Sequence, residues 1–552
     1  MMRQYEIDRS DTSVYPLGAV PTEKGMHFSF VTRGEQAALV LYEAGAAEPV
    51  GRMDFPPELR MGDVWNMSLA GEFAGLEYVY EVDNVLVEDP CGRQFAGREQ
   101  WGSRTGRVTP LRAVIRAAAE EFDWEGDKNP EIPYNKCVFY RLHPRGFTKH
   151  PSSGVAVRER GTFKAIGEKI PYLKELGVTT LEMQPPVEFD EVMRLEWPGV
   201  YEAPEAEIKL NYWGYAPGLL MAPKASYSAG PGKEPAGEFK NLVKELHRAG
   251  LELVIELFFT GKESPAQVLE AARCWAREYH VDGIHLVGNV PAALVGSDPY
   301  LSRIKLLATG WDMGEKPGAR YLAESNDGFM LDMRSFLKGD EGMLDKLCLR
   351  TRRNPANCGV INYMADNNGF TMMDMVSYNG KHNEANGENN RDGTDCNQSW
   401  NCGAEGVTRR KKVLELRRKQ IRNAVLLLFL SQGTPRLLAG DEFGRTKKGN
   451  NNSYCQDNEI SWLNWGLLKN NEDIFEFTRE AIAFRKAHPV LHMEKEPALL
   501  DYQSLGIPDV SYHGVKTWCP EFQDSKRQLG ICLLYTSPSP RDQRGSRMPS
   551  SA

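Results

Sequence analysis

Acidic side chains lie near the ends of several predicted strands, where α/β enzymes commonly hold their reacting groups. These residues are Glu182, Glu256, Asp282, Asp312 and Asp366. A pair of carboxyl groups can exchange protons with a substrate, but only when its geometry is fixed to fractions of an ångström. A solvated or structural role is therefore the simpler interpretation of each acid. His285 could serve as a base or a metal ligand, and a hydrogen-bonded structural histidine is again the simpler interpretation.

The elements that must position these groups alternate between strands and helices from about residue 136 onward. Strand candidates are CVFYRL (137–142), VTTLEM (178–183), LELVIELFF (251–259), DGIHLV (282–287), RIKLLAT (303–309), INYM (361–364) and RLLAG (436–440). Apolar residues recur at helical spacing in 163–176, 239–249, 265–279 and 412–430. This alternation predicts parallel strands of the α/β class. Eight such units predict a closed (β/α)8 TIM barrel with its site at the carboxyl ends of the strands.

The composition excludes several classes of function. The chain has 552 residues, enough for two or three domains, and a net charge of −8 without a Lys/Arg stripe, which argues against nucleic acid. No apolar run approaches the ~20 residues that span a bilayer, and the first residues do not resemble a signal peptide, so we expect no membrane partner. The 10 cysteines form no CxxC pair. We therefore expect a cytoplasmic protein with no metal site and no cofactor.

Long motifs of the chain follow one another in the order of a known family. They are RGFTKHPSSGV (145–155), GTFKAIGEKIPYLKELGVTTLEMQP (161–185), NYWGYAP (211–217), MAPKASYSAG (221–230), INYMADNNG (361–369), YNGKHNEANGENNRDG (378–393) and LLAGDEFGRTKKGNNNSYCQDNEISW (437–462). Together they resemble the isoamylase and glycogen-debranching branch of the α-amylase family, glycoside hydrolase family 13. The resemblance runs from about residue 10 to residue 532. Such ordered matches indicate common ancestry more strongly than common activity.

The catalytic positions of that family are altered in this chain. The family nucleophile ends a Gly-x-Arg-x-Asp pattern, and the matching stretch GIHLV (283–287) places His285 at the arginine and Val287 at the nucleophile. The proton donor of an Ala-Glu-Pro-Trp-Asp-like pattern matches Thr309. A valine cannot form a glycosyl ester, and a threonine hydroxyl is too weak an acid to protonate the leaving oxygen.

The supporting positions are altered as well. The third carboxylate of the family matches Asn368, and the histidine before it matches Asn367. In the third-strand motif only the carboxylate character of Glu256 remains. Because catalytic residues act as a unit, their joint loss removes nearly all rate enhancement, often ~10⁶-fold. The resemblance therefore predicts that no catalytic residue is intact.

Sugar-binding positions of the family are retained. Tyr215 matches the aromatic platform under the reacting sugar ring, and Trp213 would pack behind it. His382 and Asn386 lie on the loop after the seventh strand and could reach glucan hydroxyl groups. An equally simple role for these two residues is to brace that long loop through bonds to the backbone.

The chain divides into four expected segments. Alternating runs such as MHFSFV (26–31), AALVLYE (37–43) and LEYVYEV (76–82) predict that residues 1–115 form an N-terminal β-sandwich, similar to the carbohydrate-binding-like module of this family. Residues 130–486 should form the barrel. Residues 487–532 should form a truncated C-terminal β domain that includes WCPEF and GICLL. Residues 533–552 turn abruptly to Ser, Pro and Arg, and we interpret them as a non-native tail, with a native disordered tail as the alternative.

The resemblance and the altered positions together imply a pseudoenzyme of glycogen or α-glucan metabolism. It would bind glycogen or maltodextrin and act as a glucan-binding or regulatory member. By analogy with plant isoamylases, an active debranching paralogue is a candidate partner. By family the chain would be a glycoside hydrolase, so an active α-1,6-glucosidase of the isoamylase type is one alternative. New chemistry in the old pocket, using Glu256, His285 or Asp366, is the other.

Overall fold

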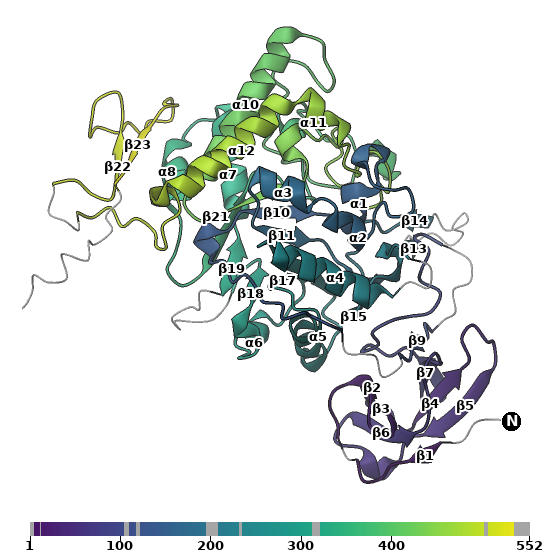
Figure 1. The fold of residues 1–552 in the computed structure, drawn as a ribbon. Coiled ribbons are helices and arrows are strands. Elements are labelled where there is room, and N and C mark those ends of the chain that lie inside the picture. Colours follow the sequence, from purple (N-terminus) through teal and green to yellow (C-terminus); the bar gives the residue numbers. More distant parts are fainter. Residues whose placement is uncertain are drawn as a thin grey trace, which may run out of the picture.

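Eight parallel strands close into a barrel at the centre of the computed structural model (Figure 1). The structure describes residues 5–11, 13–103, 110–116, 122–194, 208–230, 234–311, 321–501 and 506–534. In barrel order the strands are β10 (Phe139–Leu142), β11 (Thr180–Met183), β16 (Glu252–Phe259), β17 (Gly283–Gly288), β18 (Lys305–Ala308), β19 (Leu322–Ser325), β20 (Gly359–Tyr363) and β21 (Thr434–Leu438). Parallel pairing of β21 with β10 closes the ring, which confirms the predicted TIM barrel.

Seven of these strands coincide with the predicted apolar runs, and β19 does not. Its four residues, LAES, offer neither an apolar run nor a clear alternation, so neighbouring strands rather than local pattern define it. Strand β17 ends at Gly288, where φ is +88° and a Cβ atom would lie 2.2 Å from the carbonyl oxygen of Phe259. Only glycine fits this close approach, so β17 stops one residue after Val287.

Helices surround the barrel. They include α4 (Pro235–Arg248), α5 (Pro265–Glu278), α7 (Asp327–Lys338), α8 (Leu344–Arg352), α10 (Lys411–Leu430) and α12 (Glu472–Ala487). The single helix expected over 163–176 is two, α2 (Phe163–Gly167) and α3 (Ile170–Leu176). Pro171 lies in the first turn of α3, where its missing N–H is tolerated, and it would break a continuous helix. Among the described residues, no helix combines the length and the apolar character that crossing a bilayer requires.

Two antiparallel sheets precede the barrel. One contains β1 (Glu6–Ile7), β6 (Val64–Ala70), β3 (Gly25–Val31) and β2 (Gly18–Pro21). The other contains β5 (Pro49–Asp54), β4 (Ala37–Tyr42), β7 (Glu77–Val82), β8 (Val85–Val87) and β9 (Ala113–Val114). Phe28 and Met67 of the first sheet share one buried cluster with Leu39 and Tyr80 of the second. The two sheets therefore pack face to face as a sandwich.

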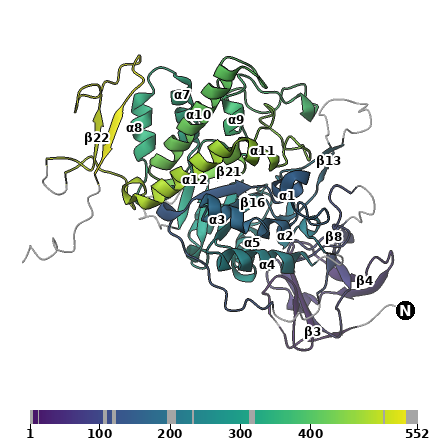
Figure 2. The same ribbon diagram turned by 45° about the horizontal axis from the view of Figure 1, so that its top comes forward.

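A two-stranded hairpin follows the barrel, formed by β22 (Val510–His513) and β23 (Gly530–Leu533). It lies at the opposite end of the molecule from the N-terminal sheets in both views (Figures 1 and 2). GICLL supplies β23, but the expectation of a strand at WCPEF was wrong. That stretch forms a turn in which Trp518 has a φ of +63°. Residues 535–552 of the expected tail lie outside the described part of the chain.

Candidate functional site

Six charged side chains meet inside the barrel near the carboxyl ends of its strands. Arg141 of β10 forms ion pairs with Glu182 of β11 and Glu256 of β16, and its Nε lies 2.9 Å from Asp366, which follows β20. Arg436 of β21 lies 3.2 Å from Glu182 and 2.5 Å from Asp366. The side chains of Glu182 and Glu256 have no exposed surface, and those of the two arginines are 4% and 1% exposed. We call these residues, together with His285, the ionic cluster.

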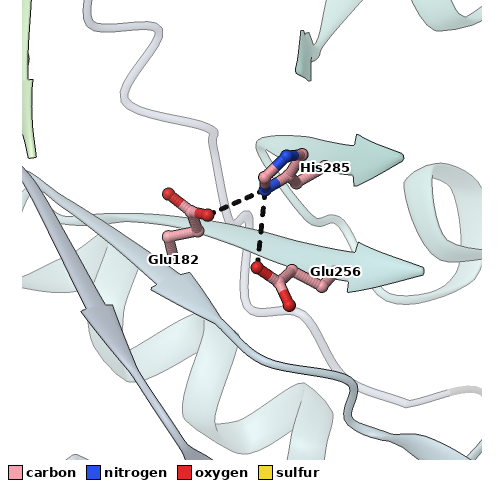
Figure 3. Close-up of side chains that lie close together, drawn as sticks. All are labelled: Glu182, Glu256 and His285. Carbon is pink, nitrogen blue, oxygen red and sulfur yellow. Dashed lines mark hydrogen bonds and ion pairs between the residues drawn. The ribbon is translucent and has the colours of Figure 1, made fainter. Parts of the chain in front are cut away.

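His285 completes the ionic cluster from β17. Its Nδ1 lies 2.8 Å from Glu182 and 3.4 Å from Glu256, and the other ring nitrogen points away from both glutamates (Figure 3). Burial opposes a charged imidazole, but the hydrogen bond and charge of Glu182, followed by those of Glu256, raise the pKa of His285. When His285 is protonated, its charge and those of the two guanidinium groups balance the charges of the three carboxylates.

The ionic cluster also contains a possible ligand set for a metal ion. Glu182, Glu256 and His285 each offer one ligand atom, and these atoms lie within 4.8 Å of one another. The same carboxylates already contact Arg141, and Nδ1 of His285 holds the proton that links them. A cation would have to displace a guanidinium group and that proton. The contacts therefore fit an ion-pair network better than a metal centre.

The positions predicted from the resemblance to match the family's acids lie at or just after the ends of barrel strands. Val287 is half-buried near the end of β17, and Thr309 is exposed directly after β18. Asn368 is exposed after β20, whereas its neighbour Asn367 is buried. The carbonyl oxygen of Asn367 accepts a hydrogen bond from Lys447 at 2.7 Å. The side chains of Val287, Thr309 and Asn368 lie near the carboxyl ends of the barrel strands, and none of them can act as a nucleophilic carboxylate or a strong acid.

Glu182 and Glu256 approach the spacing that a retaining glycosidase uses, about 5 Å between its two carboxyl groups. Their ligand atoms lie within 4.8 Å, but both side chains are fully buried and paired with Arg141. Nearby cations hold the pKa of Glu182 far below its usual range despite burial; Arg436 contributes most, followed by Arg141. Glu182 therefore cannot donate a proton near neutral pH, and neither carboxylate is open to a sugar.

Tyr215, the expected aromatic platform, forms hydrogen bonds with the ionic cluster. The Tyr215 hydroxyl donates to Glu256 at 2.8 Å and accepts from Arg141 at 3.1 Å. The ring of Trp213 lies 5.9 Å from that of Tyr215 and 6.4 Å from that of Tyr454, edge-on to both. Tyr215 is half-buried and Trp213 is buried. Tyr215 therefore stays partly open, and Trp213 supports it from behind.

The polar run after β20 forms hydrogen bonds with the loop after β21. Asn386 is buried and donates to Asp392 at 2.7 Å and to the carbonyl oxygen of Asn452 at 2.9 Å. His382 is exposed and contacts Glu405 at 3.2 Å. The contacts of Asn386 favour the bracing role, while an exposed His382 leaves the predicted glucan contact possible for that residue.

Neither arginine of the ionic cluster was predicted from the sequence as a site residue. Arg141 and Arg436 lie within the predicted strands CVFYRL and RLLAG, and a charged residue inside an apolar barrel strand is a signal that could have been used. Asp282, one of the acids considered, precedes β17 and is hydrogen-bonded to His247 at 2.9 Å, at the amino end of the strand. Asp312 lies outside the described residues.

Sequence comparison finds relatives that cover most of the chain. It is 31% identical to the glycogen operon protein GlgX homolog of Mycobacterium tuberculosis, over 88% of this chain and 80% of that protein. It is 32% identical to the glycogen debranching enzyme of Erwinia tasmaniensis, over 87% of this chain and 85% of the relative. Chloroplastic isoamylase 1 of Arabidopsis thaliana is 29% identical over 95% of this chain and 80% of its own length. No family model matches the chain.

Solved structures share the fold at lower identity. The catalytic module of the glycogen-degrading pneumococcal virulence factor SpuA superposes with a TM-score of 0.70 and 18% identity, over 93% of this chain and 87% of that one. The pullulanase of Paenibacillus barengoltzii in complex with maltohexaose and α-cyclodextrin superposes with a TM-score of 0.66 and 22% sequence identity. The superposition covers 87% of this chain and 82% of the pullulanase chain. At this level of identity the likeness establishes the fold alone.

Proposed function

Because the chain belongs to the isoamylase and glycogen-debranching branch of the α-amylase family, we propose that it binds α-glucan without cleaving it. Its relatives carry names from glycogen metabolism, and two similar structures were solved with maltohexaose or maltotetraose. The half-open ring of Tyr215 supplies a flat apolar face of the kind that stacks on a pyranose. Glycogen or a maltodextrin is the ligand class this proposal names.

One observation carries the non-catalytic part of the proposal. Three acids near the carboxyl ends of the barrel strands, Glu182, Glu256 and Asp366, are all engaged by arginine. The resemblance matches Val287 and Thr309, near the ends of β17 and β18, to the family's nucleophile and acid. Glycosidic hydrolysis by the family mechanism needs a free carboxylate and a carboxylic acid on either side of the bond. A buried carboxylate paired with arginine can neither attack the sugar nor protonate the leaving oxygen.

A reducing-end assay on glycogen tests the absence of cleavage. We expect a rate about 10⁶-fold below that of an active debranching enzyme, because the catalytic unit is missing as a whole. The Erwinia tasmaniensis debranching enzyme serves as the positive control. Reducing ends that accumulate with time and disappear in Tyr215→Ala would restore the hydrolase interpretation. A low rate of reducing-end release that is the same in Tyr215→Ala would come from a contaminating hydrolase.

Affinity electrophoresis in gels that contain maltodextrin tests binding. We expect retarded migration of the wild type and about tenfold weaker retardation of Tyr215→Ala, because a stacking face is lost. Tyr300→Ala is the matched control, since Tyr300 is 40% exposed on a barrel loop outside the mouth. Unretarded wild-type protein would contradict the proposal.

The regulatory part of the proposal names an active debranching paralogue as partner. Family membership supports this partner, and so does the ring of Tyr215, which would let this protein and an active relative bind the same glucan. Adding this protein to an active relative should change that enzyme's rate on glycogen, and Tyr215→Ala should change it less. An unchanged rate at all ratios of the two proteins would remove the regulatory role and leave binding alone.

A further inference from the structure

A small enclosed cavity lies beside the ionic cluster, between the first strand of the barrel and the loop after its last strand. Its volume is about 20 Å³. Polar residues that line it include Arg141, Gln184, Tyr212, Arg445 and Lys447. A cavity of this size holds one particle about as large as a water molecule or a monatomic ion, and no sugar ring.

Several buried polar groups of the residues that line this cavity have no hydrogen-bond partner among the described residues. They include Nε of Arg445, the side-chain nitrogen of Gln184 and the hydroxyl of Tyr212; the side chains of Gln184 and Tyr212 are 3% and 2% exposed. Each unsatisfied buried group costs about 1–3 kcal/mol, so a native fold rarely leaves several of them at one place. The Gln184 amide nitrogen can only donate and the Tyr212 hydroxyl can also donate, so a single acceptor between them would satisfy both.

Two cations at the cavity, Arg445 and Lys447, form no direct ion pair with a carboxylate among the described residues. Arg445 donates to the carbonyl oxygens of Ala439 and Ser461, and Lys447 donates to that of Asn367. Neither side chain lies within 4.0 Å of a carboxylate oxygen in the described part of the chain. Arg141, on the same wall, is already balanced within the ionic cluster.

Lys447 is the most confined of these cations. Burial, followed by the charge of Arg445, lowers the pKa of its ammonium group to about 7, against the opposite effect of Asp374, Asp366 and Asp441. Two of the three ammonium protons have no partner among the described residues. A negative particle beside Lys447 would hold it protonated and satisfy those protons.

His143 adds no charge of its own to the wall. Its Nδ1 accepts from the backbone N–H groups of Arg145 and Gly146, and its Nε2 donates to the carbonyl oxygen of Tyr212 at 2.7 Å. Burial lowers the pKa of His143 to about 3, so the imidazole stays neutral. The balance of the cavity therefore depends on Arg445 and Lys447.

We propose that this cavity binds one small monovalent anion of halide size, held by Lys447, Arg445, Gln184 and Tyr212. Donors without acceptors and cations without carboxylates both call for a negatively charged acceptor, and the volume limits it to a single particle. Lys447 links the site to the barrel mouth, because it also holds the backbone of Asn367. The inference does not depend on glucan binding.

Diffraction from crystals soaked in sodium bromide tests the site directly. The wild-type protein should show an anomalous bromide peak within hydrogen-bond reach of Lys447 and Tyr212. The peak should vanish in Lys447→Met, which keeps the length of the side chain and removes the charge. It should persist in Lys448→Met, because the Lys448 side chain is 61% exposed and points to the surface. A cavity that holds only water in wild-type crystals would overturn the proposal.

Thermal unfolding at constant ionic strength provides a second measurement in solution. Replacing gluconate by bromide at pH 7 should raise the melting temperature of the wild type and of Lys448→Met saturably, by about 2 °C. Lys447→Met and Tyr212→Phe should lose most of that rise. An equal rise in all four proteins would mean general salt stabilisation and would contradict a specific site. If Lys447→Met fails to fold, Tyr212→Phe and the bromide peak still decide the outcome.

Discussion

At the residue scale, Arg141 determines what the interior of the barrel can do. It contacts Glu182, Glu256 and Asp366, so the acids that survive at the strand ends act as partners of a buried cation. Their carboxyl groups are close enough for glycosidase chemistry, but desolvation and charge pairing remove them from it. The sequence predicted that Val287, Thr309 and Asn368 stand where the family has acids, and this stays a prediction. It could not predict the pairing, because partners from separate strands meet only once the barrel closes.

Asp441 supports a prediction about pH at the same scale. Burial raises the pKa of its carboxyl group to about 7 from an ordinary value of 3.8, although the N–H of Met372 donates to it at 3.0 Å. Below pH 3.8 the group is protonated in both states, so it costs nothing there. As pH rises to 7 the unfolded state loses its proton first, and the folded state is progressively destabilised.

Asp441→Asn should therefore stabilise the protein increasingly with pH. The difference in free energy of unfolding between variant and wild type should grow by about 2–3 kcal/mol from pH 5 to pH 8. Urea unfolding at several pH values measures it. Asp63→Asn is the control, because that side chain is 51% exposed. A difference that stays constant with pH would show that Asp441 is ionised in the folded protein at pH 5.

At the element scale, strands that carry their own apolar pattern were predictable and segments defined by neighbours were not. The runs LELVIELFF and DGIHLV became β16 and β17, whereas β19 has four residues and relies on β18 and β20. The polar run after β20 was recognised as a motif. Its partner loop was not, because the hydrogen bonds between the loops join residues that lie far apart in the chain.

Asn451 holds these two loops together. It is fully buried, and its side chain donates to the carbonyl oxygen of Thr394 at 2.7 Å and to Asn397 at 2.8 Å, while accepting from Asn383 at 2.9 Å. Asn451→Ala should lower the free energy of unfolding by about 2–4 kcal/mol, because several buried groups lose their partners.

Hydrogen exchange shows where that loss falls. Protection of backbone amides should fall more in residues 378–400 than in the barrel strands, because the hydrogen bonds of the Asn451 side chain hold the loop and not the barrel. Asn289→Ala is the matched control, since Asn289 is exposed and its side chain donates one hydrogen bond, to the carbonyl oxygen of Thr260. Uniform protection in Asn451→Ala would contradict the bracing role of the loop.

At the scale of the whole molecule, we propose the division expected from the sequence: a sandwich in 1–115, a barrel in 130–486 and a partial β domain in 487–532. The two N-terminal sheets, the closed barrel and the C-terminal hairpin support it. Charged residues join the sandwich segment to the barrel. Arg93 lies 2.9 Å from Glu278 and Arg98 lies 3.0 Å from Glu188, the latter pair almost completely buried.

Arg98 should couple the two parts during unfolding. Arg98→Met leaves Glu188 buried beside Lys224 alone, so we expect a loss of about 3–5 kcal/mol and a separate early calorimetric transition. Arg33→Met is the control, because that side chain is 92% exposed. A single transition with unchanged midpoint in Arg98→Met would show that the sandwich and barrel do not depend on this pair.

The neutral sum of the ionic cluster has an evolutionary consequence. On the proposal that the chain has lost its catalytic acids, the cations and carboxylates of the ionic cluster now balance one another without them. An aspartate introduced at position 287 alone would add an unbalanced negative charge next to the ionic cluster. If that proposal holds, we expect reversion by single substitutions to pass through less stable intermediates.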